Sequence, residues 1–243
     1  MLKTLVAGLA LASSWTWIIG MYLPRIMMER HGWAGFLAFA VPNVIGCTAF
    51  GFVLRKPGAA TALRTQIEGE AKWFSSATIA FHVLFAVFLV KSLLGEDGLS
   101  VPQSEAPVAA GAFLGAALLL SLLPKSVFPW LGALVWVGSI TLFGLRADTP
   151  ITSAAPCDLN ALWSLPLFTA GLLICPYLDL TFHEVRRSAH HAAFGIFGVA
   201  FALMLLLTVV IWMGDGPRLG PWVLGHLVGQ ALFTTSWHLG ALR

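Results

Sequence analysis

Residues 192–213 read AAFGIFGVAFALMLLLTVVIWM, a run of 22 residues that contains no charged side chain. An α-helix rises about 1.5 Å per residue, and about 20 mostly apolar residues cross the roughly 30 Å hydrocarbon core of a bilayer. This stretch therefore predicts a membrane-spanning helix. It sets the class of the whole chain, because seven further stretches resemble it.

The composition supports an integral membrane protein. The 243 residues are 58% hydrophobic and 10% charged, and their mean hydropathy is +0.85. Soluble domains carry about 45–50% apolar and about 25% charged residues. So few charges exclude a soluble globular enzyme, a disordered chain and a nucleic-acid-binding protein. Three cysteines, an odd number without close spacing, exclude a disulfide scaffold and a zinc or iron–sulfur module. The expected partner is the lipid bilayer, and no nucleic acid is expected.

The chain divides into about eight predicted transmembrane helices, separated by short turns rich in glycine, proline and charge. The predicted fold is an all-α, polytopic membrane protein with a single transmembrane domain, residues 1–243. Residues 55–72 mix charges with apolar residues and predict a cytoplasmic interfacial helix. The eight spans are residues 4–23, 33–54, 73–95, 107–124, 127–145, 160–182, 190–213 and 222–241.

The distribution of lysine and arginine orients the predicted bundle, because cytoplasmic loops carry an excess of both. Nine fall on the side of the N-terminus and five on the opposite side. Both termini are therefore expected in the cytoplasm of a bacterial-type inner or plasma membrane. The start of the chain resembles a secretory signal, but its apolar run continues to Leu23, so an uncleaved first helix is expected. The nine are Lys3, Arg55, Lys56, Arg64, Lys72, Lys125, Arg186, Arg187 and Arg243, and the five are Arg25, Arg30, Lys91, Arg146 and Arg218.

Two predicted spans contain polar interruptions. The first span carries Ser13-Ser14-Trp15-Thr16-Trp17 at mid-depth, where hydroxyls can take over backbone hydrogen bonds if the helix unwinds. Close packing through small residues is the alternative. The sixth span carries Cys175-Pro176-Tyr177-Leu178-Asp179. A carboxylate there faces a cavity or a partner, or it pairs with Arg186 or Arg187 at the cytoplasmic end.

Other residues of the spans have structural interpretations. Pro42 predicts a kink in the second span, and Asn43 is placed to bond the freed carbonyl or a neighbouring helix. Seven tryptophans near span ends predict interfacial anchors. They are Trp33, Trp73, Trp130, Trp163, Trp212, Trp222 and Trp237.

The histidines leave a haem alternative open. His82, His226 and His238 fall within predicted spans, and paired histidines bind haem in membrane bundles. His82 and His226 differ in predicted depth by roughly 10 Å, from 1.5 Å per residue, so no haem is expected. The sequence contains no hydrolase triad, no phosphate-binding loop and no His-Glu-x-x-His, and we expect no enzymatic activity.

Residues 13–54 resemble the first helical pair of sodium:solute symporters and of the broader amino-acid–polyamine–cation transporters. The resemblance rests on Ser13 to Pro24 and on Phe39-Ala-Val-Pro-Asn-Val-Ile-Gly46. The interruption at Pro176–Asp179 falls where that fold has its second unwound helix. The complete fold contains two inverted five-helix repeats, so eight spans imply a reduced form with interrupted helices one and six facing each other.

The leading prediction is a transporter-like protein with a small-solute or cation site between the first and sixth spans. The resemblance implies a monovalent cation such as sodium and no other cofactor. The predicted ligand-binding residues are Ser13, Ser14, Trp15, Thr16, Trp17, Asn43, Pro176, Tyr177 and Asp179, with no catalytic residue and no metal ligand from protein side chains.

The alternative is a non-transporting structural or assembly subunit of a membrane complex, or a homo-oligomer. Small residues around Gly111, Gly115, Gly195 and Gly198 would allow close contact with another chain. A b-type haem electron carrier is the third possibility.

Overall fold

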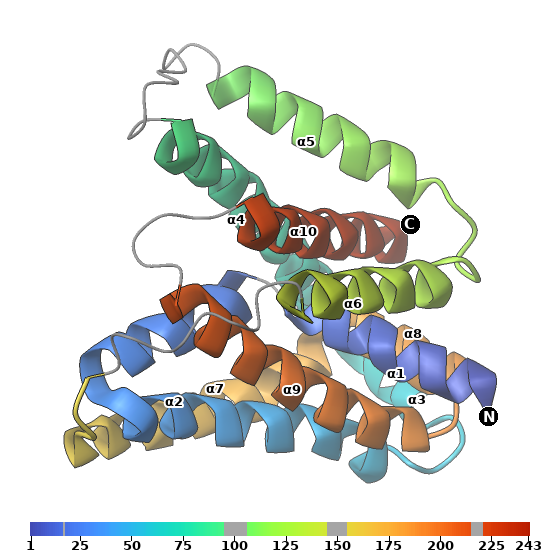
Figure 1. Cartoon of the computed structure of the whole chain (residues 1–243). Coiled ribbons are helices and arrows are strands. Elements are labelled where there is room, and N and C mark those ends of the chain that lie inside the picture. The colour runs from blue at the N-terminus through green and yellow to red at the C-terminus, as the bar shows by residue number, and fades with distance from the viewer. Residues whose placement is uncertain (17, 95–105, 145–154, 215–220) are drawn as a thin grey trace.

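The computed structural model describes residues 1–16, 18–94, 106–144, 155–214 and 221–243, and these residues confirm the predicted all-α class. They form ten α-helices and one 3-10 helix, and no strand occurs among them (Figure 1). The elements are α1 Leu2–Trp15, α2 Ile18–Val53, α3 Ala59–Gln66, α4 Glu68–Leu94, α5 Ala106–Ser121, α6 Phe128–Gly144, η2 Leu159–Ser164, α7 Leu165–Leu178, α8 Leu180–Ser188, α9 Ala192–Gly214 and α10 Pro221–Leu242.

Four stretches of helix are long and apolar enough to cross a membrane. They are Ile18–Val53, Glu68–Phe88, Leu159–Leu178 and Ala192–Val210. Leu2–Trp15, Pro107–Ser121 and Phe128–Leu142 are shorter apolar helices. Each of the eight predicted spans thus has a helical counterpart, although the first two are divided differently.

The outer surface of the bundle is apolar, unlike that of a soluble protein. Large apolar side chains lie on the outside, among them Leu84 on α4, Val108 on α5 and Val199 on α9, which are 68%, 70% and 74% exposed. Polar side chains such as His82 and Gln230 lie fully buried between the helices. An apolar exterior of this kind suits contact with lipid.

The first reversal of the chain occurs at Gly32, and the predicted end of the first span at residue 23, just before Pro24, is wrong. Pro24 lies buried inside α2, and Gly32 is the one residue of α2 with non-helical backbone angles (φ 59°, ψ −151°). Residues 18–31 and 33–53 are therefore two helical segments. A methyl group on Gly8 or on Gly51 would strike the start of α9, at Ala193 and Phe194 respectively. The ends of α1 and α2 thus meet at one end of the bundle.

Gly32 is held in place by a segment more than 120 residues away. A Cβ on Gly32 would lie 2.5 Å from the carbonyl oxygen of Ala155. The Asp158 N–H donates to the carbonyl oxygen of His31 (3.1 Å), and His31 Nδ1 donates to the Asp158 carboxylate (3.0 Å). This last hydrogen bond, followed by one from the Asn160 N–H, lowers the pKa of Asp158 below its ordinary value. We call this arrangement the Gly32 corner.

Both termini lie at the same end of the bundle, together with α3 and α8 (Figure 1). Lys125 Nζ donates to Glu184 (2.9 Å), and Arg186 Nε donates to the carbonyl oxygen of Leu54 (2.9 Å). The structure thus gathers the segments that the charge count places on one side. The predicted interfacial segment, residues 55–72, forms α3, and its last residues already belong to α4.

An aromatic cluster fills the core between α1, α2, α8 and α9. Phe182 contacts Trp15, Phe50, Phe194 and Phe197, with ring centroids 4.9–5.8 Å apart. Edge-on and offset ring pairs at such distances stabilise a core beyond their buried area. The core thus packs the part of α8 that follows Asp179 directly against the end of α1.

Small residues and tryptophans differ in part from their predicted roles. A Cβ on Gly198 would strike Thr48, so this glycine serves packing between α2 and α9 within the chain. Trp237 is buried and donates its indole N–H to Glu184 (3.0 Å), so it is not an interfacial anchor. The Glu184 side chain holds the ring at the edge of a cavity. Trp33, Trp73, Trp130 and Trp163 are exposed, while the side chains of Trp212 and Trp222 lie outside the described residues.

Candidate functional site

Two helices are interrupted where the sequence predicts. The helix α1 ends at Trp15, Thr16 has φ −76° and ψ 46°, and α2 begins at Ile18. The helix α7 ends at Leu178, Asp179 is extended (φ −85°, ψ 115°), and α8 begins at Leu180. Trp17, a predicted site residue, lies outside the described residues.

The hydroxyls of the first interruption are buried, and two of them bond to backbone. Ser13 Oγ donates to the carbonyl oxygen of Gly132 on α6 (2.8 Å), and Thr16 Oγ1 donates to that of Ala12 (2.6 Å). Ser14 Oγ is buried and has no hydrogen-bond partner among the described residues. The first interruption therefore leaves one hydroxyl available to a ligand.

Trp15 and Asn43 come together directly. The Trp15 indole N–H donates to Asn43 Oδ1 (2.8 Å), and Cys47 Sγ lies 3.4 Å from the same oxygen. The predicted role of Asn43 as a bond to a neighbouring helix is thus confirmed, and the backbone angles stay helical at Pro42. The indole of Trp15 is held by this bond and by the ring of Phe182.

Asp179 forms the second interruption and caps α8. Its Oδ1 accepts hydrogen bonds from the N–H and the hydroxyl of Thr181, both at 2.7 Å, and its Oδ2 lies 3.6 Å from His238 Nε2. Asp179 and His238 are 2% and 1% exposed. The alternative pairing with Arg186 does not occur, because that guanidinium donates to the carbonyl oxygens of Leu54 and Arg55.

The carbonyls freed by the second interruption are satisfied inside the protein. The carbonyl oxygen of Pro176 accepts from the Asp179 N–H (3.4 Å), and that of Tyr177 accepts from His183 Nε2 (2.8 Å). His183 Nδ1 lies 3.0 Å from the carbonyl oxygen of Ala60. His183 thus ties α3 to the end of α7.

The side chain of Tyr177 lies apart from Trp15. Its ring contacts Phe50 at 5.1 Å, Phe50 contacts Phe182 at 5.6 Å, and Phe182 contacts Trp15 at 4.9 Å. Tyr177 therefore reaches the first interruption only through two intervening rings. It does not line a common space with Trp15.

A line of buried polar side chains on α10 connects the two interruptions. His226, Gln230, Thr234 and His238 recur at every fourth residue, and each is at most 1% exposed. Residues four apart lie on one helix face, about 6 Å apart along the axis. We call these four residues the α10 polar line. The line extends about 18 Å, from 12 residues at 1.5 Å each.

The α10 polar line meets three other helices and the second interruption. His226 Nδ1 and Gln230 Nε2 both lie 2.9 Å from Ser139 Oγ on α6. Thr234 Oγ1 donates to the carbonyl oxygen of Ser14 at the end of α1 (3.1 Å). Beyond its contact with Asp179, His238 places Nδ1 3.0 Å from Ser75 Oγ on α4. The line therefore passes both interruptions.

Sequence reasoning identified His226 and His238 but missed Gln230 and Thr234. The four-residue spacing was the available signal, because polar residues at that spacing inside an apolar helix predict one buried polar face. His82, the other candidate haem ligand, places Nδ1 2.7 Å from the carbonyl oxygen of Thr78. Among the described residues, no group of three or more His, Cys, Asp or Glu side chains could hold a metal ion.

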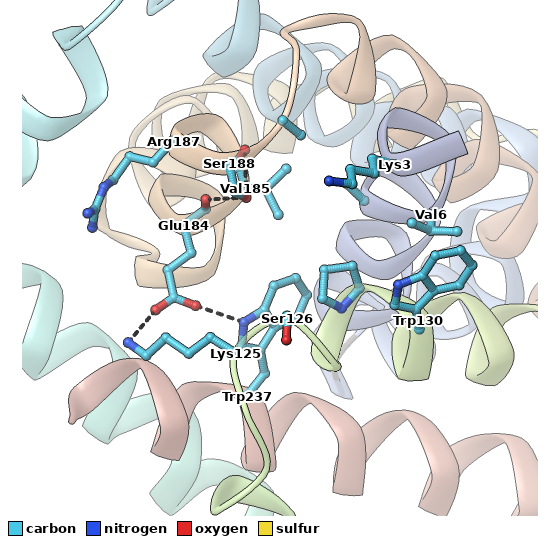
Figure 2. A pocket seen from close by; sticks show the side chains of 13 residues that line it. Lys3, Val6, Lys125, Ser126, Trp130, Glu184, Val185, Arg187, Ser188 and Trp237 are labelled. Atoms are coloured by element: carbon cyan, nitrogen blue, oxygen red, sulfur yellow. Dashed lines mark hydrogen bonds and ion pairs between the residues drawn. The ribbon is translucent and has the colours of Figure 1, made fainter. Parts of the chain in front are cut away.

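A cavity of about 610 Å³ opens at the end of the bundle where the termini lie. Figure 2 shows Glu184 between Lys125 and Trp237, which donate to its two carboxylate oxygens at 2.9 and 3.0 Å. Lys3 and Trp130 line the side formed by α1 and α6. Trp237 of α10 lines this cavity, and no residue of the α10 polar line does.

Comparison with known proteins adds no relative. No protein-family model, no curated protein and no solved structure matches this chain.

Proposed function

We propose that this chain is a transporter-like integral membrane protein whose cation or small-solute site lies between the α1/α2 and α7/α8 interruptions. The observation that carries the proposal is the α10 polar line, which contacts both interruptions from one helix. Unwound backbone is tolerated in membrane proteins where it is buried in protein or lines a cavity. The resemblance of residues 13–54 to sodium:solute symporters agrees with such a site.

Asp179 is the residue that supplies the charge in this proposal. A buried carboxylate beside a buried histidine binds either a proton or a monovalent cation such as sodium. His238 lies beside it, and Thr234, about one turn earlier on α10, bonds to the carbonyl oxygen of Ser14. The cavity beside Glu184 and Trp237 offers the route from the end where the termini lie.

The test measures how cations affect the thermal stability of the purified protein. We expect the melting temperature of the wild type to be higher in sodium than in choline at equal ionic strength, and Asp179→Asn to remove that difference. A shift of about 2–4 °C corresponds to about 1 kcal/mol for a chain of this size. Glu29→Gln is the control, because Glu29 forms only a surface pair with Arg25. A wild type whose melting temperature is the same in sodium and in choline contradicts the proposal.

The eight-span topology predicts how the native cysteines react. Cys157 is exposed beside the Gly32 corner, at the end of the bundle opposite the termini, whereas Cys47 is buried. A membrane-impermeant maleimide should therefore label Cys157 from outside intact cells, and Cys157→Ser should abolish that labelling. A reporter fused after Arg243 should read cytoplasmic. Labelling of Cys157 only in inverted vesicles would reverse the orientation.

The second candidate is an assembly subunit, and the outer face of α5 favours it. A Cβ added at Gly111 or Gly115 would meet nothing within 4 Å, so neither glycine serves packing inside the chain. Glycines four apart allow close contact between membrane helices.

We expect Gly111→Leu to leave the melting temperature of the isolated chain within about 2 °C, since surface substitutions change stability by about 0.5 kcal/mol or less. The same change should disrupt an oligomer or complex that forms through α5. Co-purification of a stoichiometric partner by the wild type and its loss in Gly111→Leu would support the subunit role. An unchanged assembly would exclude this face.

A further inference from the structure

A second cavity lies beside the first, shares Arg187, Ser188 and Ala189 with it, and is strongly basic. Its volume is about 570 Å³, and it lies where the loop after α2 meets the turn between α8 and α9. No carboxylate occurs among the residues that line it. We call it the basic pocket. Its charged and titratable residues are Arg55, Lys56, Arg186, Arg187, His190 and His191.

One arginine builds the pocket rather than filling it. Arg186 donates to the carbonyl oxygens of Leu54 (2.9 Å), Arg55 (2.6 Å) and Ala189 (3.4 Å). These bonds fix the end of α2 against the α8–α9 turn. They use neutral acceptors, so the positive charge of the guanidinium is not neutralised by them.

The remaining cations lie at the rim with their charged ends in reach of a ligand. Arg55, Lys56 and Arg187 are exposed, and none of them forms an ion pair with a carboxylate in the described part of the chain. The first turn of α3 also lines the pocket through Ala60 and Thr61. First-turn N–H groups lack helical acceptors and carry the positive end of the helix dipole.

His190 and His191 lie side by side at the rim of the basic pocket. Their ring centroids are 3.9 Å apart, and His190 Nδ1 accepts a hydrogen bond from the Ala192 N–H (3.2 Å). Partial burial, followed by the neighbouring His190, Arg186 and Arg55, lowers the pKa of His191 below its ordinary value. A negative charge in the pocket would offset this repulsion.

We propose that the basic pocket binds a phosphate-bearing anion. Arg and Lys side chains, helix first-turn N–H groups and the absence of a lining carboxylate are the features that recognise phosphate. Known ligand pockets range from about 300 to 1,000 Å³, so the volume accommodates a phosphate with an attached organic group. The positive-inside rule places the pocket on the cytoplasmic side, where both anionic lipid headgroups and free phosphate compounds occur. The proposal rests on the basic pocket and uses neither Asp179 nor the α10 polar line, although Arg187 also lines the first cavity.

The experiment has two arms on the purified full-length protein. The first measures binding of inorganic phosphate at constant ionic strength by titration calorimetry. The second measures, by native mass spectrometry, retention of phosphatidylglycerol from mixed phosphatidylglycerol–phosphatidylcholine nanodiscs. Each arm compares the wild type with Lys56→Gln/Arg187→Gln and with the control Arg64→Gln/Lys72→Gln. Both double variants remove two positive charges, but Arg64 and Lys72 lie outside the pocket.

We expect the Lys56/Arg187 variant to bind at least tenfold more weakly in one arm, while the control binds as the wild type does. A loss in the first arm identifies free phosphate as the ligand, and a loss confined to the second identifies the lipid headgroup. Both side chains are exposed, so the variant should fold, and its melting temperature verifies this. Equal binding by both double variants, or no binding by the wild type in either arm, overturns the proposal.

Discussion

Replacing Gly32 with alanine should destabilise the protein by about 2–4 kcal/mol, which corresponds to a fall in melting temperature of about 5–15 °C. The backbone angles of Gly32 (φ 59°, ψ −151°) lie in a region that only glycine adopts readily, and a non-glycine residue there costs of order 1–3 kcal/mol. The added methyl group would also strike the carbonyl oxygen of Ala155. To relieve that contact, the segment that contains Ala155 and Asp158 would have to move away from His31, to which Asp158 bonds.

The matched control is Gly111→Ala. Gly111 lies in α5 with open space around its Cα, and alanine is favoured over glycine in a helix by up to about 1 kcal/mol. This variant should therefore be as stable as the wild type or slightly more stable. Thermal unfolding in one detergent, followed by circular dichroism, compares the two. If Gly32→Ala unfolds at the wild-type temperature, the backbone at Gly32 does not require glycine, and the close contact with Ala155 is absent.

Asp179→Ala should lower the stability by about 3–5 kcal/mol, whereas Asp179→Asn should lower it by no more than about 2 kcal/mol. Loss of a helix N-cap costs about 0.5–2 kcal/mol, and each buried donor left without an acceptor costs about 1–3 kcal/mol. Alanine removes the acceptor for the N–H and the hydroxyl of Thr181 and the neighbour of His238. Asparagine keeps one carbonyl oxygen for Thr181, removes the charge, and places an NH₂ group where the second oxygen lies beside His238.

Denaturation of the two variants separates the structural role of Asp179 from its proposed role in cation binding. The asparagine variant should be folded and insensitive to the cation, and the alanine variant should be clearly less stable. His238→Gln removes the imidazole that lies beside Asp179. In a chain that carries this change, the difference in stability between Asp179→Ala and Asp179→Asn should be smaller. Equal stability of Asp179→Ala and Asp179→Asn would show that the cap on α8 contributes nothing measurable.

The apolar runs predict the helices well, because their period and length are local properties of the chain. Both interruptions were predictable for the same reason, since Ser13 to Trp17 and Pro176 to Asp179 break an apolar pattern. The position of the first turn was not predictable, because the contact that selects Gly32 comes from Ala155 and Asp158. Pro24 is tolerated inside the helix because neighbouring groups can satisfy the carbonyl it frees.

The partners of the candidate site residues also depend on tertiary structure. From the sequence, Arg186 and Arg187 are the nearest basic residues that could pair with Asp179. In the structure the basic side chain beside Asp179 is His238, from α10. Ser13 was expected to face a ligand, but Gly132 on α6 supplies its acceptor. Such pairings join residues 59 or more positions apart, and no local pattern distinguishes them from their alternatives.

The α10 polar line also has a consequence for biogenesis in the membrane. Ser14, Ser75, Ser139 and Asp179, which bond or face its four side chains, all precede α10 along the chain. A ribosome therefore completes every partner helix before His226 emerges. A helix with two histidines and a glutamine on one face inserts into lipid poorly by itself, because polar side chains unpaired in hydrocarbon are costly. If α10 spans the membrane as the sequence predicts, we expect it to insert stably only after α1, α4, α6 and α7 have assembled around its polar face.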